Sequence, residues 1–347
     1  MDGNSLQELP NFICSFTNLQ KLTIAENQLL KLPENLGNLI NLEQLDVFGN
    51  QISLLPESIG KCSKLTKVNF TKNKLTALPN SICELTALEQ LILDENKLAK
   101  LPENIGKLTN LTEIMLFDNQ LTGLPESFGN LSKITSLNLA NNKLINLPES
   151  FGNLGEMNFL SIEKNELTKF PTTIGKLKKL QKIYAHNNKL AALPNEIGEL
   201  SALKTFDLRN NRLATLPGSF GKLLQLTEAD FGENKFTALP SALSEIKGLT
   251  ALRFDSNKIT KLDATVAKFA HCTELDLSAN GLATVAAEIG KCKLLHNLNL
   301  SNNALTVAPK GLKELTQLKM LDIRNNKLAK DQKTLLKKWL PSTDIRI

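Results

Sequence analysis

Two cysteines and two histidines near the C-terminus of the chain combine residue types that bind zinc in many proteins. Cys272 directly follows His271, and Cys292 lies shortly before His296. Cys272, however, replaces a leucine that recurs along the chain, and Cys292 replaces a second recurring leucine. Because free cysteine packs as a small apolar side chain, we predict that both thiols lie in the core and that the chain binds no metal.

Other reactive side chains are also placed without the partners that catalysis needs. Tyr184 and His186 form the one neighbouring pair that would suggest proton transfer, but the spacing fixes no acid or nucleophile beside them. Cys62 takes a core leucine position, whereas Cys14 and Cys83 replace a recurring glycine, and no histidine is placed to activate a thiol. The chain also lacks a P-loop and the HExxH and GxSxG motifs. We predict a protein without enzymatic activity, catalytic residues or cofactors.

The composition narrows the class of protein further. The 347 residues carry a formal net charge of +6, and aromatic residues make up 5%, so we expect an aliphatic core. No run of about 20 apolar residues is present, which predicts no membrane insertion. The opening MDGNSLQELPNF has neither the basic nor the apolar region of a signal peptide. Five cysteines without a framework spacing indicate a reducing compartment, so we predict a cytoplasmic location.

One asparagine recurs every 23 residues, from Asn4 to Asn326, without an insertion. Around it the pattern reads L-x-x-L-x-L-x-x-N-x-L-x-x-L-P-x-x-I/F-G-x-L, which places alternate residues of a short strand in the core. After the strand, asparagine can satisfy buried backbone donors and acceptors, because its side chain has both functions. Proline fixes φ at the entry to the return segment, and glycine near its end tolerates a positive φ. One coil cannot bury its own apolar edge, so the coils must stack as a solenoid.

This pattern resembles the leucine-rich repeat family over essentially the whole chain, and its LPxxIGxL segment is similar to that of cytosolic Ras-pathway scaffolds and many bacterial members. The resemblance implies an α/β solenoid, a horseshoe with a parallel β-sheet on the concave face and short helical or irregular segments on the convex face. We expect one domain over 1–347, with a partial N-terminal repeat at 1–18, about fourteen repeats at 19–330 and a C-terminal helical cap at 331–347. In the cap, apolar residues recur at helical spacing, and the final DIRI would form a closing strand; the apolar residues are Leu335, Leu336, Trp339 and Leu340.

Two parts of the array depart from the pattern. The chain starts within a repeat, which indicates either a shortened or naturally short start, or an edge whose unpaired strand meets another domain or a second copy. Farther along, Asp263 and Ala286 stand where proline recurs, and DATVAKFA predicts a short helix with Asp263 as its N-cap.

The outward-facing strand positions of the concave face carry the residues best suited to binding. Aromatic and methionine side chains are enriched in the energetically dominant parts of interfaces, and an exposed apolar track indicates a partner. Strands also favour such residues for local reasons, which is the alternative interpretation. The predicted track consists of Phe48, Ile92, Met115, Phe117, Phe159, Tyr184 and His186.

Charged side chains line the same predicted face. Acidic residues outnumber basic ones there, although the whole chain is positively charged, so nucleic acid is disfavoured as a ligand. This sign favours a protein or peptide partner with basic residues around an apolar centre. The charged candidates are Asp94, Asp118, Asp207, Arg209, Asp230, Arg253 and Asp276.

The sequence therefore predicts a non-enzymatic scaffold that binds a protein or peptide on its concave face. One alternative is a recognition domain of a larger signalling enzyme, such as a kinase, GTPase or ubiquitin ligase. A second alternative is a secreted bacterial adhesin or effector. Self-association through the N-terminal edge is a further prediction that follows from the unpaired strand.

Overall fold

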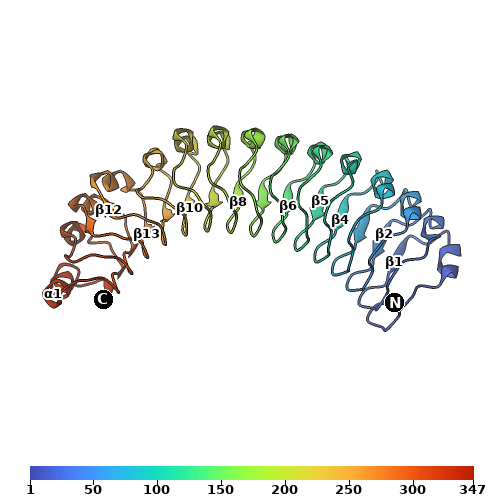
Figure 1. The fold of residues 1–347 in the computed structure, drawn as a ribbon, viewed down its shortest axis with the longest axis horizontal. Helices are drawn as coiled ribbons and strands as arrows, with labels where there is room; N and C mark the ends of the chain where they lie inside the picture. Colours follow the sequence, from blue (N-terminus) through green and yellow to red (C-terminus); the bar gives the residue numbers. More distant parts are fainter. The chain divides into compact units, whose positions relative to one another are not determined.

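The computed structural model describes residues 1–347, which divide into two compact units. The N-terminal unit spans Met1–Leu180 and the C-terminal unit spans Gln181–Ile347, and each is considered by itself. Both are stacks of coils in which a three-residue strand alternates with a return segment that contains a short 3₁₀ turn. Within each unit the strands follow the inner side of the stack and the 3₁₀ turns follow the outer side (Figure 1). The predicted solenoid of parallel strands and short convex segments is confirmed.

Seven strands and eight 3₁₀ turns make up the N-terminal unit. Neighbouring strands pair in parallel with a register of 23 residues, as in Lys21↔Gln44. The strands are β1 (Lys21–Thr23), β2 (Gln44–Asp46), β3 (Lys67–Asn69), β4 (Gln90–Ile92), β5 (Glu113–Met115), β6 (Ser136–Asn138) and β7 (Phe159–Ser161). The turns are η1 (Asn11–Ser15), η2 (Leu36–Asn38), η3 (Glu57–Lys61), η4 (Asn80–Glu84), η5 (Ile105–Lys107), η6 (Glu126–Asn130), η7 (Glu149–Asn153) and η8 (Thr172–Lys176).

The C-terminal unit continues with the same coil and adds two features of its own. Its main strands are β8 (Lys182–Tyr184), β9 (Thr205–Asp207), β10 (Glu228–Asp230), β11 (Ala251–Arg253), β13 (Glu274–Asp276), β15 (Asn297–Asn299), β16 (Met320–Asp322) and β17 (Asp344–Arg346). Its 3₁₀ turns are η9 (Asn195–Glu199), η10 (Gly218–Lys222), η11 (Ser241–Glu245), η12 (Ala264–Phe269), η13 (Ala287–Lys291) and η14 (Lys310–Glu314). The two added features are a second ladder, β12 (Lys261–Leu262) with β14 (Thr284–Val285), and the helix α1 (Lys330–Trp339).

The recurring asparagine forms the hydrogen-bonded ladder that its chemistry predicts. Asn96 is 8% exposed, and its Nδ2 donates to the carbonyl oxygens of Phe70 at 2.9 Å, Leu93 at 3.1 Å and Asp94 at 3.1 Å. Its Oδ1 accepts from the backbone N–H of Leu75 at 3.0 Å. One side chain thus satisfies backbone groups of its own coil and of the preceding coil, and these groups lie where water does not reach them.

The recurring glycines have a different role from the one predicted. Their φ angles are not positive, so the prediction of a left-handed backbone there is wrong. A methyl group at Gly129 would instead overlap the carbonyl oxygen of Ser150 on the neighbouring coil. The left-handed position is the residue directly before each recurring asparagine, as at Asp118, where φ is 53°. Glycine is therefore needed for the close stacking of return segments. The left-handed position is glycine only at Gly3 and Gly49, and the other coils place a non-glycine residue in this costly backbone conformation.

The core is less uniformly aliphatic than the composition suggests. In the C-terminal unit, Phe231 stacks on Phe254 with ring centroids 5.0 Å apart and meets Phe220 and Phe236 edge-on at 5.8 and 5.7 Å. All four rings are fully buried. Ala229 occupies an inward strand position where most other coils carry leucine or isoleucine, so the larger rings fill the volume that it leaves.

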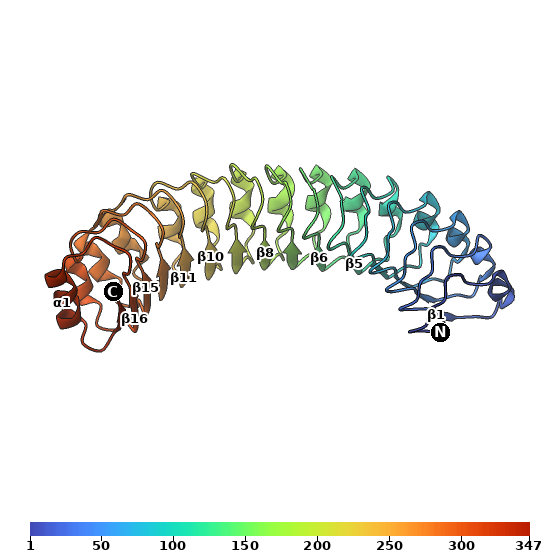
Figure 2. The ribbon, with the colours of Figure 1, turned by 60° about the horizontal axis from the view of Figure 1, so that its bottom comes forward.

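Both ends of the array and its irregular repeats are ordered by specific contacts. The Asp263 carboxylate accepts from the backbone N–H of Thr265 at 2.9 Å, which confirms the predicted N-cap of η12. Helix α1 lies beside the last coils (Figure 2), with Leu336 fully buried, and β17 pairs with β16 as the predicted closing strand. At the other end, the N–H of Gly3 donates to the carbonyl oxygen of Ala25 at 3.0 Å.

No helix in the structure has the length and apolar character required to span a bilayer.

Candidate protein-binding surface

Side chains of the strands that point away from the core form the strand face of each unit. In the N-terminal unit, Ile92 on β4 lies directly beside Met115 on β5, and both are half-buried. Phe117 follows β5 and is 36% exposed. Phe48 and Phe159 are half-buried on the same face, but one intervening coil separates each of them from these three. The structure therefore gathers part of the predicted apolar track into a compact group, Ile92, Met115 and Phe117.

The strand face of the C-terminal unit is polar and charged. Tyr184, the one large aromatic side chain among the outward strand residues there, lies beside Asp207 in the strand register, and the row continues through Asp230, Arg253 and Asp276. A shallow hollow of about 110 Å³ lies along this row, and its lining includes Tyr184, Asp207, Asp230 and Arg253. The predicted aromatic and acidic candidates of this unit are thus brought together along one row.

Arg253 is the basic centre of this row. Its Nη1 donates to Oε1 of Glu228 at 2.8 Å, and its Nη2 lies 3.7 Å from Oε2 of Glu274. The hydrogen bond to Glu228 and the nearby carboxylates raise the pKa of the guanidinium. Because Arg253 is bound to neighbours on both sides, the acidic character of the row is reduced at its middle and remains stronger on either side.

His186 and Arg209 lie beside the same row. Nδ1 of His186 is 3.1 Å from Oδ2 of Asp207, close enough for an ion pair when the imidazole is protonated, but the two groups are not aligned as a hydrogen bond. Arg209 is exposed. The pair Tyr184 and His186 thus has an acid nearby, which the spacing of the sequence did not reveal, but the structure places no nucleophile or metal ligand set beside it.

Many of the acidic side chains in the row also have a structural task. Oδ1 of Asp207 accepts from the backbone N–H of Arg209 at 3.0 Å, and Oδ1 of Asp230 accepts from Gly232 at 2.9 Å. Asp276 makes the equivalent bond to the N–H two residues later at 2.8 Å. One carboxylate oxygen of each therefore caps the end of its strand. The second oxygen of Asp276 accepts from Nδ2 of Asn299 at 2.9 Å, and that of Asp207 lies beside His186.

Asp94 and Asp118 are the charged candidates of the N-terminal unit. The coil of β5 carries Met115 where many other coils carry Asp or Asn, so the N–H of Phe117 lacks a cap from its own coil. Oδ1 of Asp94 accepts from this N–H at 2.7 Å. Burial raises the pKa of Asp94 to about 6, with contributions from Glu95 and Glu113. Asp118 accepts a hydrogen bond from the side chain of Asn141 at 2.6 Å. Both carboxylates are thus partly committed to the fold.

The cysteines lie in the core, as their positions in the repeat predict. Burial raises the pKa of Cys272 to about 12 and that of Cys292 to about 11, so both thiols stay protonated at neutral pH. Their sulfur atoms donate to the carbonyl oxygens of Leu249 and Val266 at 3.1 and 3.3 Å. Metal ligation needs thiolates, and these two groups are held as neutral hydrogen-bond donors.

Comparison with known proteins decides the family. The family described as "Leucine-rich repeat region" matches residues 34–120, "Leucine rich repeat" matches 270–328, and a shorter "Leucine Rich Repeat" matches 110–131, 133–154 and 202–223. A Leptospira interrogans LRR protein of known structure is 32% identical, with a TM-score of 0.80, over 99% of this chain and 93% of that chain. The chain belongs to the leucine-rich repeat family.

Other leucine-rich repeat structures are similar at lower identity. An internalin from Listeria monocytogenes is 21% identical with a TM-score of 0.71, over 96% of this chain and 88% of that chain, which shows the shared fold. The plant peptide hormone receptor RGFR1, solved in complex with RGF2, is 28% identical with a TM-score of 0.68, over 94% of this chain and 62% of that chain. No curated protein sequence matches the chain significantly. The leucine-rich repeat fold is one that supports protein–protein interaction.

Sequence reasoning missed one class of exposed apolar residues in this leucine-rich repeat chain. Leu30, Leu54 and Leu224 are 58%, 60% and 64% exposed, which is more than any residue of the predicted track. None of them belongs to a strand of its unit. The sequence does signal these residues, because a large apolar side chain stands at a variable position outside the strands. The strand positions do not include it.

Proposed function

We propose that this leucine-rich repeat protein is a non-enzymatic scaffold that binds a protein or peptide through its strand faces. The observation that carries the proposal is the group formed by Ile92, Met115 and Phe117, where apolar side chains lie in register on a surface without a structural need for them. Inward positions of the same strands already fill the core, so these outward side chains contribute little to folding. Apolar groups of this kind provide the central contacts of interfaces.

The charges of the C-terminal unit support a basic partner. Asp207, Asp230 and Asp276 place carboxylates along one row, and the second oxygens of Asp207 and Asp276 also contact His186 and Asn299. A partner with lysine or arginine residues beside an apolar segment would complement both kinds of surface. The similar protein RGFR1 is a plant peptide hormone receptor whose structure was solved in complex with RGF2, which supports a peptide as the kind of partner.

The proposal is tested by affinity capture from a lysate of the native host, followed by rebinding of the purified captured protein. We expect Phe117→Lys and Tyr184→Lys to weaken rebinding at least tenfold, and the interaction to weaken as salt rises. Phe12→Lys is the matched control, because Phe12 is an aromatic residue that is 62% exposed on η1, away from the strands. All three variants should unfold at nearly the wild-type temperature.

Two results would contradict this function. Equal rebinding by wild type and both strand-face variants would place the binding surface elsewhere. A large loss of stability in Phe117→Lys would show that the side chain is part of the core. The cytoplasmic location, the recognition-domain and adhesin alternatives, the single-domain organisation and self-association through the N-terminal edge stay predictions.

A further inference from the structure

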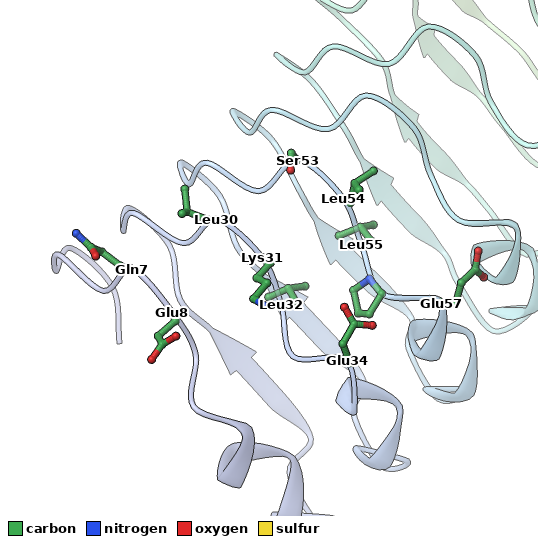
Figure 3. Close-up of a pocket in the computed structure, with 11 residues that line it drawn as sticks. Gln7, Glu8, Leu30, Lys31, Leu32, Glu34, Ser53, Leu54, Leu55 and Glu57 are labelled. Atoms are coloured by element: carbon green, nitrogen blue, oxygen red, sulfur yellow. The ribbon is translucent and has the colours of Figure 1, made fainter.

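A second surface lies on the flank of the N-terminal unit, away from the strand face. A groove of about 710 Å³ crosses the first three coils, on the segments that lead from the strand ends to the 3₁₀ turns (Figure 3). A smaller hollow of about 230 Å³ adjoins it and shares Glu8, Lys31, Leu32 and Glu34 with it. Together they are several times larger than the hollow on the strand face of the C-terminal unit, which measures about 110 Å³.

The groove presents two leucines on successive coils. Leu30 is 58% exposed and Leu54 is 60% exposed, and both line the groove. At the place of Leu30, the next three coils carry Ser53, Thr76 and Ala99. Leucine is therefore not required there by the repeat, and single exposed leucines are ordinary, but two facing one groove form a local apolar patch.

The backbone is also incompletely paired at this place. Along the flank of this unit, the N–H of Leu30 donates to the carbonyl oxygen of Gln7 at 3.4 Å, and the N–H of Thr76 donates to that of Ser53 at 3.3 Å. The bond between them in the series, from the N–H of Ser53 to the carbonyl oxygen of Leu30, is not formed. The backbone bonds along the flank of these first coils are therefore long or absent, and this part of the chain is loosely paired.

The charge around the groove is predominantly negative. Glu8, Glu34 and Glu57 line it, one from each coil, and all three are exposed, whereas Lys31 is its only basic residue. An anionic rim around an apolar floor attracts cationic side chains and repels anionic ones. The charge therefore selects among the apolar segments that would otherwise fit.

We propose that this groove binds a short peptide segment of a partner protein in which two adjacent leucine-like side chains are flanked by lysine or arginine. The leucines would contact Leu30 and Leu54, and the basic groups would lie against Glu34 and Glu57. This surface uses none of the residues of the strand face, so it stands independently of the function proposed above. Its small area implies weak affinity, on the order of 100 μM for an isolated peptide.

The test is a titration of the full chain, labelled at leucine methyl groups, with three synthetic hexapeptides followed by nuclear magnetic resonance. The peptides carry the cores Lys-Leu-Leu-Lys, Glu-Leu-Leu-Glu and Lys-Ser-Ser-Lys between terminal glycines. We expect saturable shifts of the Leu30 and Leu54 methyl signals with the first peptide and at least fivefold weaker binding of the other two. Leu54→Ser and the pair Glu34→Lys with Glu57→Lys should each weaken the first peptide at least fivefold.

Matched controls separate this surface from the rest of the molecule. Leu224→Ser removes an equally exposed leucine of the C-terminal unit and should leave peptide affinity unchanged. Phe117→Lys should also leave it unchanged, so failure of the strand-face function and failure of this proposal are distinguishable. Since Leu54 is exposed, Leu54→Ser should keep the wild-type unfolding temperature.

Three outcomes would overturn the proposal. The first is that no peptide moves the Leu30 and Leu54 signals. The second is that the Lys-Leu-Leu-Lys and Glu-Leu-Leu-Glu peptides bind equally well, which would remove the role of the glutamates. The third is that these methyl signals shift with protein concentration in the absence of peptide, which would assign the groove to a second copy of this chain.

Discussion

Replacing Asn96 by alanine tests the physical basis of the whole array. The substitution removes four hydrogen bonds that the side chain makes to backbone groups of two coils. It leaves the N–H of Leu75, a fully buried residue, without a partner. The carbonyl oxygen of Phe70 keeps its bond from Nδ2 of Asn73 at 3.1 Å. A buried backbone group without a partner costs about 1–3 kcal/mol, so we expect Asn96→Ala to lower the free energy of unfolding by about 2–3 kcal/mol.

The assay combines urea denaturation, followed by circular dichroism, with hydrogen exchange at single amides. Exchange is included because a long repeat array need not unfold in one step. The amide of Leu75 should lose protection in Asn96→Ala. Asn4→Ala is the matched control, since Asn4 begins the same sequence column but is exposed and bonds only to carbonyl oxygens of Met1 and Asp2. It should change stability by less than about 0.5 kcal/mol.

The reasoning would be refuted by a loss below about 1 kcal/mol in Asn96→Ala, or by equal effects of the two substitutions. Unchanged protection of the Leu75 amide would carry the same meaning. Each of these results would show that the asparagine ladder accompanies the stacking of coils without stabilising it.

Three further predictions concern stacking, burial and capping. Gly129→Ala should lower the free energy of unfolding in urea by about 1–3 kcal/mol, because the added methyl group would meet a backbone oxygen. In Gly123→Ala the methyl group would have nothing within 4 Å, so the free energy of unfolding should stay within about 0.5 kcal/mol of wild type. Burial raises the pKa of Asp230 from 3.8 to about 6, so the native state binds more protons between these values and stability falls as pH rises through 6. Asp230→Asn should reduce that slope, to which Asp94 also contributes, adding on the order of 1 kcal/mol at pH 7.5 and almost nothing near pH 4. An unchanged slope would contradict the assignment. Asp263→Ala should cost about 1 kcal/mol in thermal unfolding through loss of the η12 cap, and no loss would show that the cap is dispensable.

Much of the fold was predictable because each coil repeats one local environment. The alternation in a coil such as LTEIMLF fixes which side chains enter the core, and Ile114 and Leu116 are fully buried as predicted. Val68 and Phe70 are fully buried in the same register. The helical spacing of the final segment likewise predicted α1 and the burial of Leu336. These features depend on periodicity and on contacts between nearest neighbours.

The candidate site was predictable only in part. The sequence identified the outward residues, but it did not show that Ile92, Met115 and Phe117 form a group while Phe48 and Phe159 are separated from it. It also did not show that the carboxylates of Asp207 and Asp230 cap their own strands. Such bonds depend on where a side chain turns after the strand ends, and the residue type alone permits several directions.

The amino-acid sequence alone predicts the repeat, the face on which each strand residue lies, the asparagine ladder, and the helix and closing strand at the C-terminal end. It could do so because these properties arise within one coil or between adjacent coils of identical pattern. The three-dimensional structure was needed to explain why position 129 is glycine and to show which residue adopts the left-handed backbone. It was also needed to show that Leu30 and Leu54 border one groove. Those properties depend on the separation of backbone and side-chain atoms on different coils, which exists only once the coils have stacked.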